Sequence, residues 1–209
     1  GMGDFFEQKL NDAGVHTQLI RGNEMTGVAH TFITPGGSRT FGTMLGAAYY
    51  MGPDDISVDM FHGYDLLHIE GYLVQDQDLI ESICQKAKQA GLILSLDLSS
   101  FNVVSKNRTY VHHLISDYID IVFANETEAK AFTGLEPREA LDEIARHCDI
   151  AIVKVGKEGS MVKSGDEYHF INAWPASPID ATGAGDTYAA GFLYAHSLGM
   201  PLKVCGEIG

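Results

Sequence analysis

A run of small residues between two acids is the part of the sequence best suited to chemistry. It spans Asp180 to Asp186, reads Asp-Ala-Thr-Gly-Ala-Gly-Asp, and leads directly into a pattern that predicts a buried helix. Backbone amides at a helix N-terminus attract an anion, because the helix dipole is positive there. An acid beside a bound phosphate is repulsive unless it takes a proton from the attacking group. An ordinary helix start would explain Asp186, but not the three small residues or Asp180.

A second candidate is Asn125-Glu126-Thr127-Glu128, at a predicted junction between a strand and a helix. In one interpretation Asn125 caps the helix and Glu128 completes a capping box. In the other, Asn125 and Glu128 hold magnesium-bound water near the phosphates of a nucleotide. Taken alone, the four residues favour the cap, and the second interpretation stays open.

The familiar phosphate-binding motifs are absent. A P-loop ending in Gly156-Lys157 would require glycine at position 151, which is alanine. A dinucleotide-binding fingerprint beginning at Gly183 would require a third glycine where Tyr188 stands.

The histidines and one further acid allow a structural or a functional interpretation. His68 and Glu70 could share a strand face, but no third metal ligand is evident, and the adjacent His112 and His113 cannot face one ligand from a helix. We therefore expect these histidines to be structural. Asp97, at the end of a predicted strand, suits a functional carboxylate and a loop cap equally.

Helical and strand patterns alternate through most of the chain. Strands are predicted at 15–20, 65–71, 92–98, 119–124 and 150–155, hairpins at 27–34 with 38–44 and at 160–163 with 168–171, and helices at 4–12, 77–90, 107–118, 126–132, 137–148 and 183–198, with a last helix beginning at Pro201. The apolar strands predict an α/β fold with a doubly wound, mostly parallel sheet covered by helices on both faces. Ligands collect at the carboxyl ends of such strands, where Asp97, Asn125 and Gly156 would lie.

Composition narrows the class of protein. The 209 residues fit one domain, with 45% hydrophobic and 20% charged residues. The formal net charge of −14 argues against nucleic acid and anionic membranes as partners. Three widely spaced cysteines (Cys84, Cys148, Cys205) predict free thiols in a reducing compartment, and the sequence contains no membrane span or basic leader. We expect a cytoplasmic protein.

Residues 180–192 resemble the C-terminal signature of the ribokinase-like (PfkB) carbohydrate kinase family, which includes adenosine kinases. Residues 125–129 are similar to its Asn-x-x-Glu motif, and 154–159 to its glycine-containing segment between a strand and a turn. Thr26-Gly27 with Ser38-Arg39-Thr40 resembles its lid-side hairpin. The resemblance covers nearly the whole chain and implies one partial ribokinase-like kinase domain over residues 1–209, with a lid-type hairpin near 26–44.

The resemblance implies an ATP-dependent kinase that phosphorylates a hydroxyl of a sugar or nucleoside. Asp186 would be the general base, and the amides of Gly183, Ala184 and Gly185 would form the anion hole for the transferred phosphoryl group. Magnesium and its waters would be positioned by Asn125 and Glu128.

Other matched residues would bind the nucleotide or a cation. ATP would be bordered by Lys154, Gly156, Gly159 and Thr182. Asp180 would help to bind a monovalent cation such as K⁺, as in some members of the family.

The resemblance also implies missing parts, because the family's first strands and its Gly-Gly-x-x-Asn substrate motif have no counterpart here. We expect a fragment that retains the phosphoryl-transfer half, so the resemblance does not identify the acceptor. One alternative is a catalytically inactive nucleotide- or sugar-binding fragment, and another is a kinase of small hydroxylated heterocycles. An unpaired sheet edge would favour a homodimer.

Overall fold

The computed structural model describes residues 1–33, 39–175 and 182–209, which form two compact units, residues 1–60 and 61–209. The turn expected at 35–37 lies outside the described residues, as do Asp180 and Ala181. The lid role of the hairpin near 26–44 and the single kinase domain over residues 1–209 stay predictions.

The first unit consists of one helix, one hairpin and short 3₁₀ turns. Helix α1 (Met2–Asp12) is followed by the antiparallel strands β1 (Thr26–Ile33) and β2 (Arg39–Gly46), so the predicted hairpin is confirmed. Helix α1 buries none of its residues. Residues 15–20 form no strand, which makes that prediction wrong. Their weak alternation of apolar residues finds no partner strand within the described part of the chain, and a strand needs one to satisfy its backbone.

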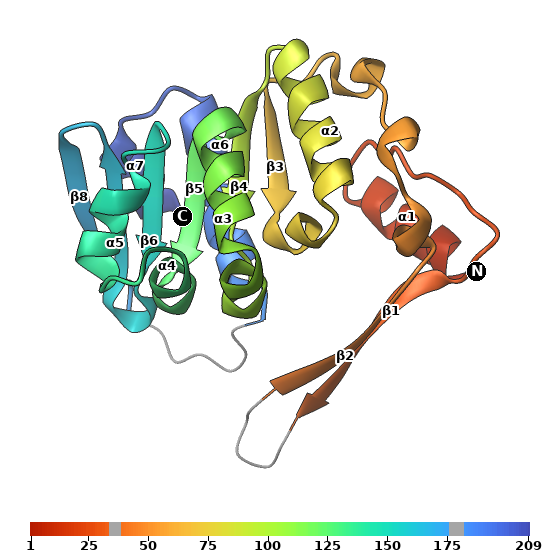
Figure 1. Ribbon diagram of the computed structural model, residues 1–209, viewed down its shortest axis with the longest axis horizontal. Coiled ribbons are helices and arrows are strands. Elements are labelled where there is room, and N and C mark those ends of the chain that lie inside the picture. Colours follow the sequence, from red (N-terminus) through yellow and green to blue (C-terminus); the bar gives the residue numbers. More distant parts are fainter. Residues whose placement is uncertain (34–38, 176–181) are drawn as a thin grey trace. The chain divides into compact units, whose positions relative to one another are not determined.

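The second unit is built on a six-stranded mixed sheet in the order β3-β4-β5-β6-β7-β8 (Figure 1). Four neighbouring strands are parallel: β3 (Leu66–Glu70), β4 (Ile93–Asp97), β5 (Ile121–Asn125) and β6 (Ile150–Lys154). The sheet continues antiparallel through β7 (Gly159–Ser164) and β8 (Glu167–Asn172). The predicted α/β class with a mostly parallel sheet is confirmed.

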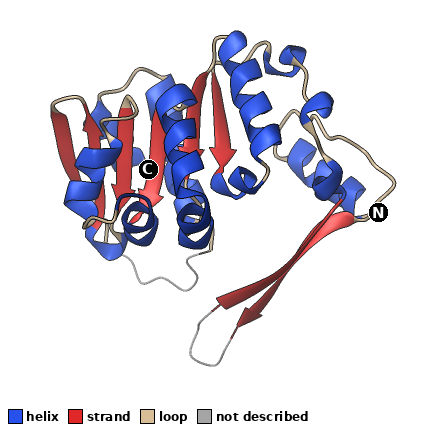
Figure 2. Ribbon diagram, viewed as in Figure 1, coloured by secondary structure: helices blue, strands red, loops and turns tan. Residues whose placement is uncertain are grey.

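Helices cover both faces of this sheet (Figure 2). One face carries α2 (Gln77–Gln89), α3 (Phe101–Tyr118), α4 (Glu126–Thr133) and α5 (Pro137–Ile144), and the other carries α6 (Ala184–Ser197) and α7 (Leu202–Ile208). Under α6 and α7, Phe123, Ile152 and Val162 of the sheet pack with Phe192 in one buried cluster. Burial on both faces explains why the strands are nearly continuous in apolar residues. No helix among the described residues is both long and apolar enough to span a bilayer.

Helix α3 begins six residues before the predicted start at Asn107. Asn107 lies inside the helix with non-helical φ −119° and ψ 22°, and its side-chain amide donates a hydrogen bond to the carbonyl of Val103 at 2.9 Å. At a helix start the side-chain oxygen of asparagine accepts from a backbone amide, whereas here the side-chain amide donates to the carbonyl one turn back, a type of bond that accompanies bends in helices. The sequence pattern therefore marked a kink, and the true start follows Ser100.

Candidate functional site

Polar side chains gather where the four parallel strands end. Glu70 is paired with Asp97 across β3 and β4, and Asn125 with Lys154 across β5 and β6. Side chains two residues apart on a strand share a face, so this register places all four on the face of the sheet that α6 covers. The expected convergence of Asp97 and Asn125 at one rim is confirmed, and Glu70 and Lys154 join them.

The predicted anion site lies at the N-terminus of α6. Gly183 is the N-cap residue and has a left-handed backbone with φ 76°, which a residue without Cβ adopts at little cost. The described residues include no side chain that caps this helix. Asp186 is exposed in the first turn, and Thr187 donates hydrogen bonds from its amide and hydroxyl to the Gly183 carbonyl. Within the described residues this helix start therefore lacks a side-chain cap, and an exposed acid stands in its first turn.

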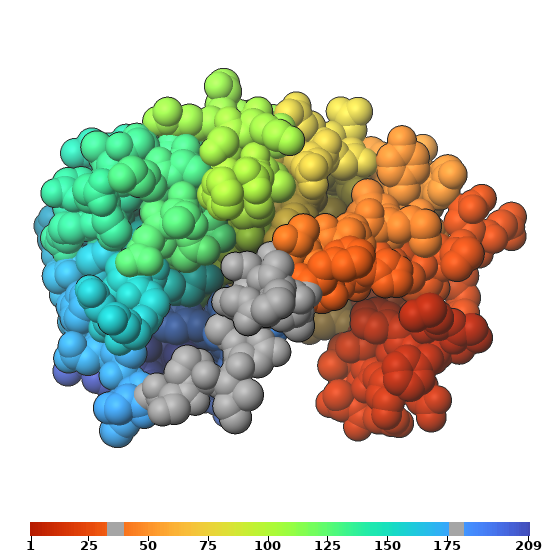
Figure 3. Space-filling view, turned by 90° about the horizontal axis from the view of Figure 1, so that it is seen from below, coloured from red at the N-terminus to blue at the C-terminus, as the bar shows by residue number. Residues whose placement is uncertain are grey.

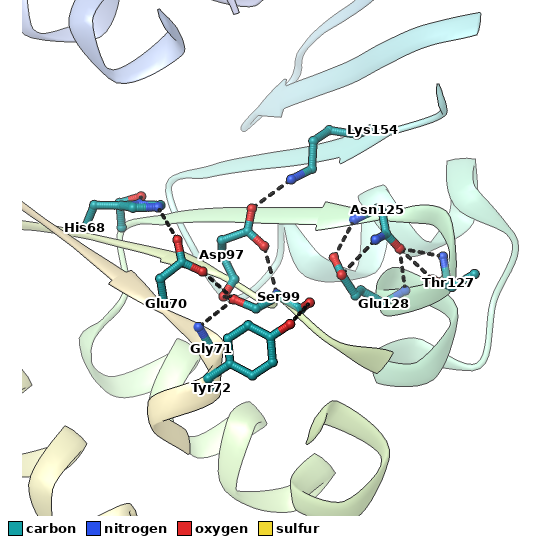
Figure 4. A network of polar contacts seen from close by, with 11 residues as sticks. His68, Glu70, Gly71, Tyr72, Asp97, Ser99, Asn125, Thr127, Glu128 and Lys154 are labelled. Atoms are coloured by element: carbon teal, nitrogen blue, oxygen red, sulfur yellow. Dashed lines mark hydrogen bonds and ion pairs between the residues drawn. The ribbon is translucent and has the colours of Figure 1, made fainter. Parts of the chain in front are cut away.

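The junction at Asn125 is closed by its own side chains. The Asn125 side-chain oxygen accepts from the amides of Thr127 and Glu128 at 2.9 and 3.0 Å. In return, Glu128 accepts from the Asn125 amide at 2.8 Å and from its side-chain nitrogen at 2.7 Å (Figure 4). Burial raises the pKa of Glu128, which is only 4% exposed. The predicted capping box is present, and both carboxylate oxygens of Glu128 are used in it.

Asp97 joins the rim to a loop with a strained backbone. Its Oδ1 accepts from the Ser99 amide at 2.8 Å, and its Oδ2 accepts from Lys154 Nζ at 2.7 Å. Ser99 has φ 57°, unusual for a residue with a side chain, and its hydroxyl donates to Glu70 at 2.7 Å. A hydrogen bond from His68 lowers the pKa of Glu70. Asp97 is thus both a loop cap and half of a buried ion pair.

Four carboxylates act electrostatically on the hydroxyl of Tyr72. Burial raises the pKa of the Tyr72 hydroxyl, and the negative charges of Glu128, Glu70, Asp186 and Asp97 raise it further. These four carboxylates therefore lie close enough to act on one phenol. A phosphorylated ligand entering this region would require compensating positive charge.

A cavity of about 800 Å³ opens beside the rim, and six predicted residues line it: Asn125, Lys154, Gly156, Gly159, Ala184 and Gly185. In the view from below, the dark blue C-terminal residues are recessed behind the cyan and light-blue segments (Figure 3). Glu128, Thr182, Gly183 and Asp186 are not among its lining residues. The cavity has the size and mixed lining of a small-molecule site.

Several residues of this cavity belong to no motif in the sequence and were not predicted. Tyr188 and Ser160 share a hydrogen bond of 2.7 Å between their hydroxyls, and both line the cavity with Trp174 and Glu207. Trp174 is the only tryptophan of the chain and is 86% exposed. Its presence as a lone tryptophan shortly before the glycine-rich motif is the one signal that could have drawn attention to it.

The described residues contain no group of three or more histidine, cysteine or acidic side chains arranged to hold a metal. Mg²⁺ typically uses one or two carboxylates, several waters and the phosphates of a substrate, so the carboxylates of this rim suit it without forming a closed cage. His68 contacts Ser95 Oγ at 2.9 Å through Nδ1, and the His112 ring stacks edge-on against His147 at 4.3 Å. Both histidines thus have contacts within the protein, and their structural role stays a prediction.

Comparison with known proteins identifies the family. A model described as pfkB family carbohydrate kinase matches residues 1–209. The chain belongs to this family. A sugar kinase from Archaeoglobus fulgidus, named as uncharacterized, is 28% identical over 205 residues, which cover 94% of this chain and 78% of the relative.

Solved structures agree in fold. An adenosine kinase from Sinorhizobium meliloti is 33% identical with a TM-score of 0.90, and the match covers 99% of this chain but 66% of that one. A putative ribokinase II from E. coli, solved with ATP and Mg²⁺, is 23% identical with a TM-score of 0.84 over 98% of this chain and 69% of its own. The chain therefore spans about two thirds of the length of these two solved chains.

Proposed function

We propose that this pfkB-family chain is an ATP-dependent, magnesium-requiring kinase that transfers the γ-phosphoryl group to a hydroxyl of a sugar or nucleoside. One observation carries the proposal: α6 begins at the border of the cavity with a glycine N-cap, no capping side chain among the described residues, and exposed Asp186 in its first turn. A side-chain cap occupies one or two of the first amides of a helix, which are then not available to a ligand. A helix start without such a cap, beside a carboxylate, suits in-line phosphoryl transfer.

Asp186 would take the proton from the acceptor hydroxyl while the oxygen of that hydroxyl forms a bond to the γ-phosphorus. The bond from that phosphorus to the β,γ-bridging oxygen breaks at the same time, and ADP leaves with the electron pair. The amides of Gly183, Ala184 and Gly185 would donate hydrogen bonds to the transferred group, and their positions on a helix start hold them in place beforehand. When bound with the nucleotide, magnesium neutralises phosphate charge. Asn125 and Glu128 would hold it through water.

The nucleotide would occupy the cavity lined by Lys154, Gly156 and Gly159. A contact of the nucleotide with Thr182 stays a prediction, because Thr182 is not among the lining residues. The E. coli relative of this fold was solved with ATP and Mg²⁺, which supports the choice of cofactor. A monovalent cation near Asp180 stays a prediction, because that residue lies outside the described part of the chain.

The acceptor is proposed as a sugar or a nucleoside because relatives bear both kinds of name. They include ribokinase, 5-dehydro-2-deoxygluconokinase, adenosine kinase and cytidine kinase. Association into a homodimer also stays a prediction. In the described sheet, β3 is an edge strand, and such an edge can pair with a second chain.

Two measurements on one sample test the proposal. Trp174 lines the cavity, so its fluorescence should change when Mg-ATP is added. A coupled assay for ADP should then show turnover with at least one of ribose, fructose or adenosine, and none after magnesium is chelated. ATP binding without turnover of any sugar or nucleoside would support the inactive binding fragment. Absence of nucleotide binding would contradict the kinase and a nucleotide-binding fragment, and would leave only a fragment that binds sugar.

A further inference from the structure

Lys154 is the sole lysine or arginine that lines the cavity within the described residues, whereas Glu126 and Glu207 add negative charge there. The chain carries a formal net charge of −14, so the surroundings repel a polyphosphate. One cation in such a cavity has a large effect on which ligand binds and where its charge lies.

The position of the Lys154 ammonium is defined from two sides. Its Nζ lies 2.7 Å from Asp97 Oδ2, and a Cβ placed on Gly185 would lie 3.2 Å from the same nitrogen. The ammonium group therefore lies against the first turn of α6. The absence of a side chain at Gly185 leaves room for it.

This position is electrostatically unfavourable for a lysine. A helix N-terminus carries partial positive charge, so a cation beside it is repelled, and the Lys154 side chain is only 16% exposed. Asp97, 8% exposed, compensates that charge and is itself held by the Ser99 amide. Stability alone would be served by an apolar residue here. An anionic ligand would instead gain from both the amides and the ammonium.

A second lysine–aspartate pair of the same sheet provides the contrast. Lys163 on β7 pairs with Asp142 on α5, and its side chain is 22% exposed. That ion pair links helix α5 to strand β7. Lys163 is not among the residues that line the cavity. The two lysines are similar in burial and in partner, and they differ in what lies next to the ammonium.

We propose that Lys154 is a further catalytic residue of the phosphoryl transfer proposed above, with its ammonium contacting the γ-phosphoryl group beside the amides of α6. Asp97 is a positioning residue, which holds the ammonium at the helix start until the nucleotide arrives. Lys154 transfers no proton in this step and donates hydrogen bonds to the phosphoryl oxygens as their charge develops. The inference rests on the proposed kinase function.

Lys154→Met tests this role against Lys163→Met as the matched control. For the wild type and each variant, Mg-ATP and Mg-ADP are titrated separately by Trp174 fluorescence or calorimetry. The kcat is measured with the acceptor that the wild type turns over fastest. Lys154→Met should lower kcat by about 10²- to 10³-fold, the usual effect of removing one donor to a developing anion. Its ATP affinity should fall by about 10-fold while its ADP affinity stays within about twofold, because ADP lacks the contacted group. Lys154→Arg should recover part of the loss, and Lys163→Met should match wild type.

Either of two outcomes would overturn the role of Lys154. One is that Lys154→Met has the same kcat as Lys163→Met. The other is that Lys154→Met loses ATP affinity and ADP affinity equally. Lys154→Met leaves Asp97 buried without its cation. The double variant Lys154→Met with Asp97→Asn is therefore measured as well. Its affinity should fall for Mg-ATP as in Lys154→Met and should be retained for Mg-ADP. A wild type that turns over while Lys154→Met keeps its rate refutes this inference only. A wild type that binds neither nucleotide refutes the proposed function with it.

Discussion

Helices α4 and α6 begin at the same region of the second unit, and each has an acid as its third residue, but the two starts differ in kind. In α4 the N-cap is Asn125, and Glu128 folds back onto it and is buried. In α6 the N-cap is Gly183, which has no side chain, and Asp186 is exposed. The asparagine satisfies its helix from within, whereas the glycine leaves the amides of its helix for a ligand.

The difference shows that the N-cap residue decides what the acid at the third position does. An acid facing a side-chain cap contributes to folding, because it satisfies a backbone donor that would otherwise be buried. An acid near a glycine N-cap, which has no side chain to bond it, contributes little to folding and is available for chemistry. Substitutions at the two starts should therefore separate stability from turnover.

The largest effect is expected from Asp186→Asn. Loss of a general base lowers kcat by about 10²- to 10⁴-fold, while the free energy of unfolding should change by no more than about 0.5 kcal/mol, because the side chain is exposed. ATP affinity should remain near that of wild type. Steady-state kinetics, calorimetry and urea unfolding measure the three quantities.

The control for Asp186→Asn is Glu139→Gln. Glu139 is likewise exposed and is the third residue of α5, outside the cavity. It should leave both turnover and stability unchanged. Near-native turnover of Asp186→Asn would contradict the role of Asp186 as base.

A smaller effect is expected from Gly183→Ala, with Gly134→Ala as its match. Both glycines have left-handed backbones, φ 76° at the start of α6 and φ 81° at the end of α4. Each alanine should cost about 1 kcal/mol of stability, since L-residues disfavour this region. Only Gly183→Ala should also lower kcat, by about 10- to 100-fold, because it displaces the anion-hole amides. Equal kcat values for the two variants would mean that the amides are not used.

The smallest expected effect concerns how the free energy of unfolding depends on pH. Glu128 and Glu70 should contribute to it with opposite signs. Burial raises the pKa of Glu128 above its ordinary 4.5, so the folded state binds its proton more tightly and its contribution to stability declines as pH rises from 4.5 through the raised value. The pKa of Glu70 is lowered, so its contribution is present above 4.5 and is lost as pH falls through the lowered value. Urea unfolding of wild type, Glu128→Gln and Glu70→Gln across this range should give differences from wild type of opposite slope. Slopes of the same sign would contradict these environments.

Local patterns in the sequence predicted most of the second unit. The apolar strands, the helix from 77 and the glycine-rich start of α6 follow from periodicity and residue type, and all are confirmed. The ion pair of Lys154 with Asp97 could not be predicted, since it joins residues 57 apart and depends on the register of three strands. The strand expected at 15–20 failed for a related reason: pairing is a property of the neighbours, and local alternation does not supply them.

The most direct test of the open start of α6 is an amide NMR titration of the 22.7 kDa chain with Mg-ATP. The backbone amide signals of Gly183, Ala184 and Gly185 should shift strongly, and more with Mg-ATP than with Mg-ADP. Those of Thr127 and Glu128, already bonded to Asn125, should move less. Saturable ATP binding that leaves the three α6 amides unmoved would contradict the account.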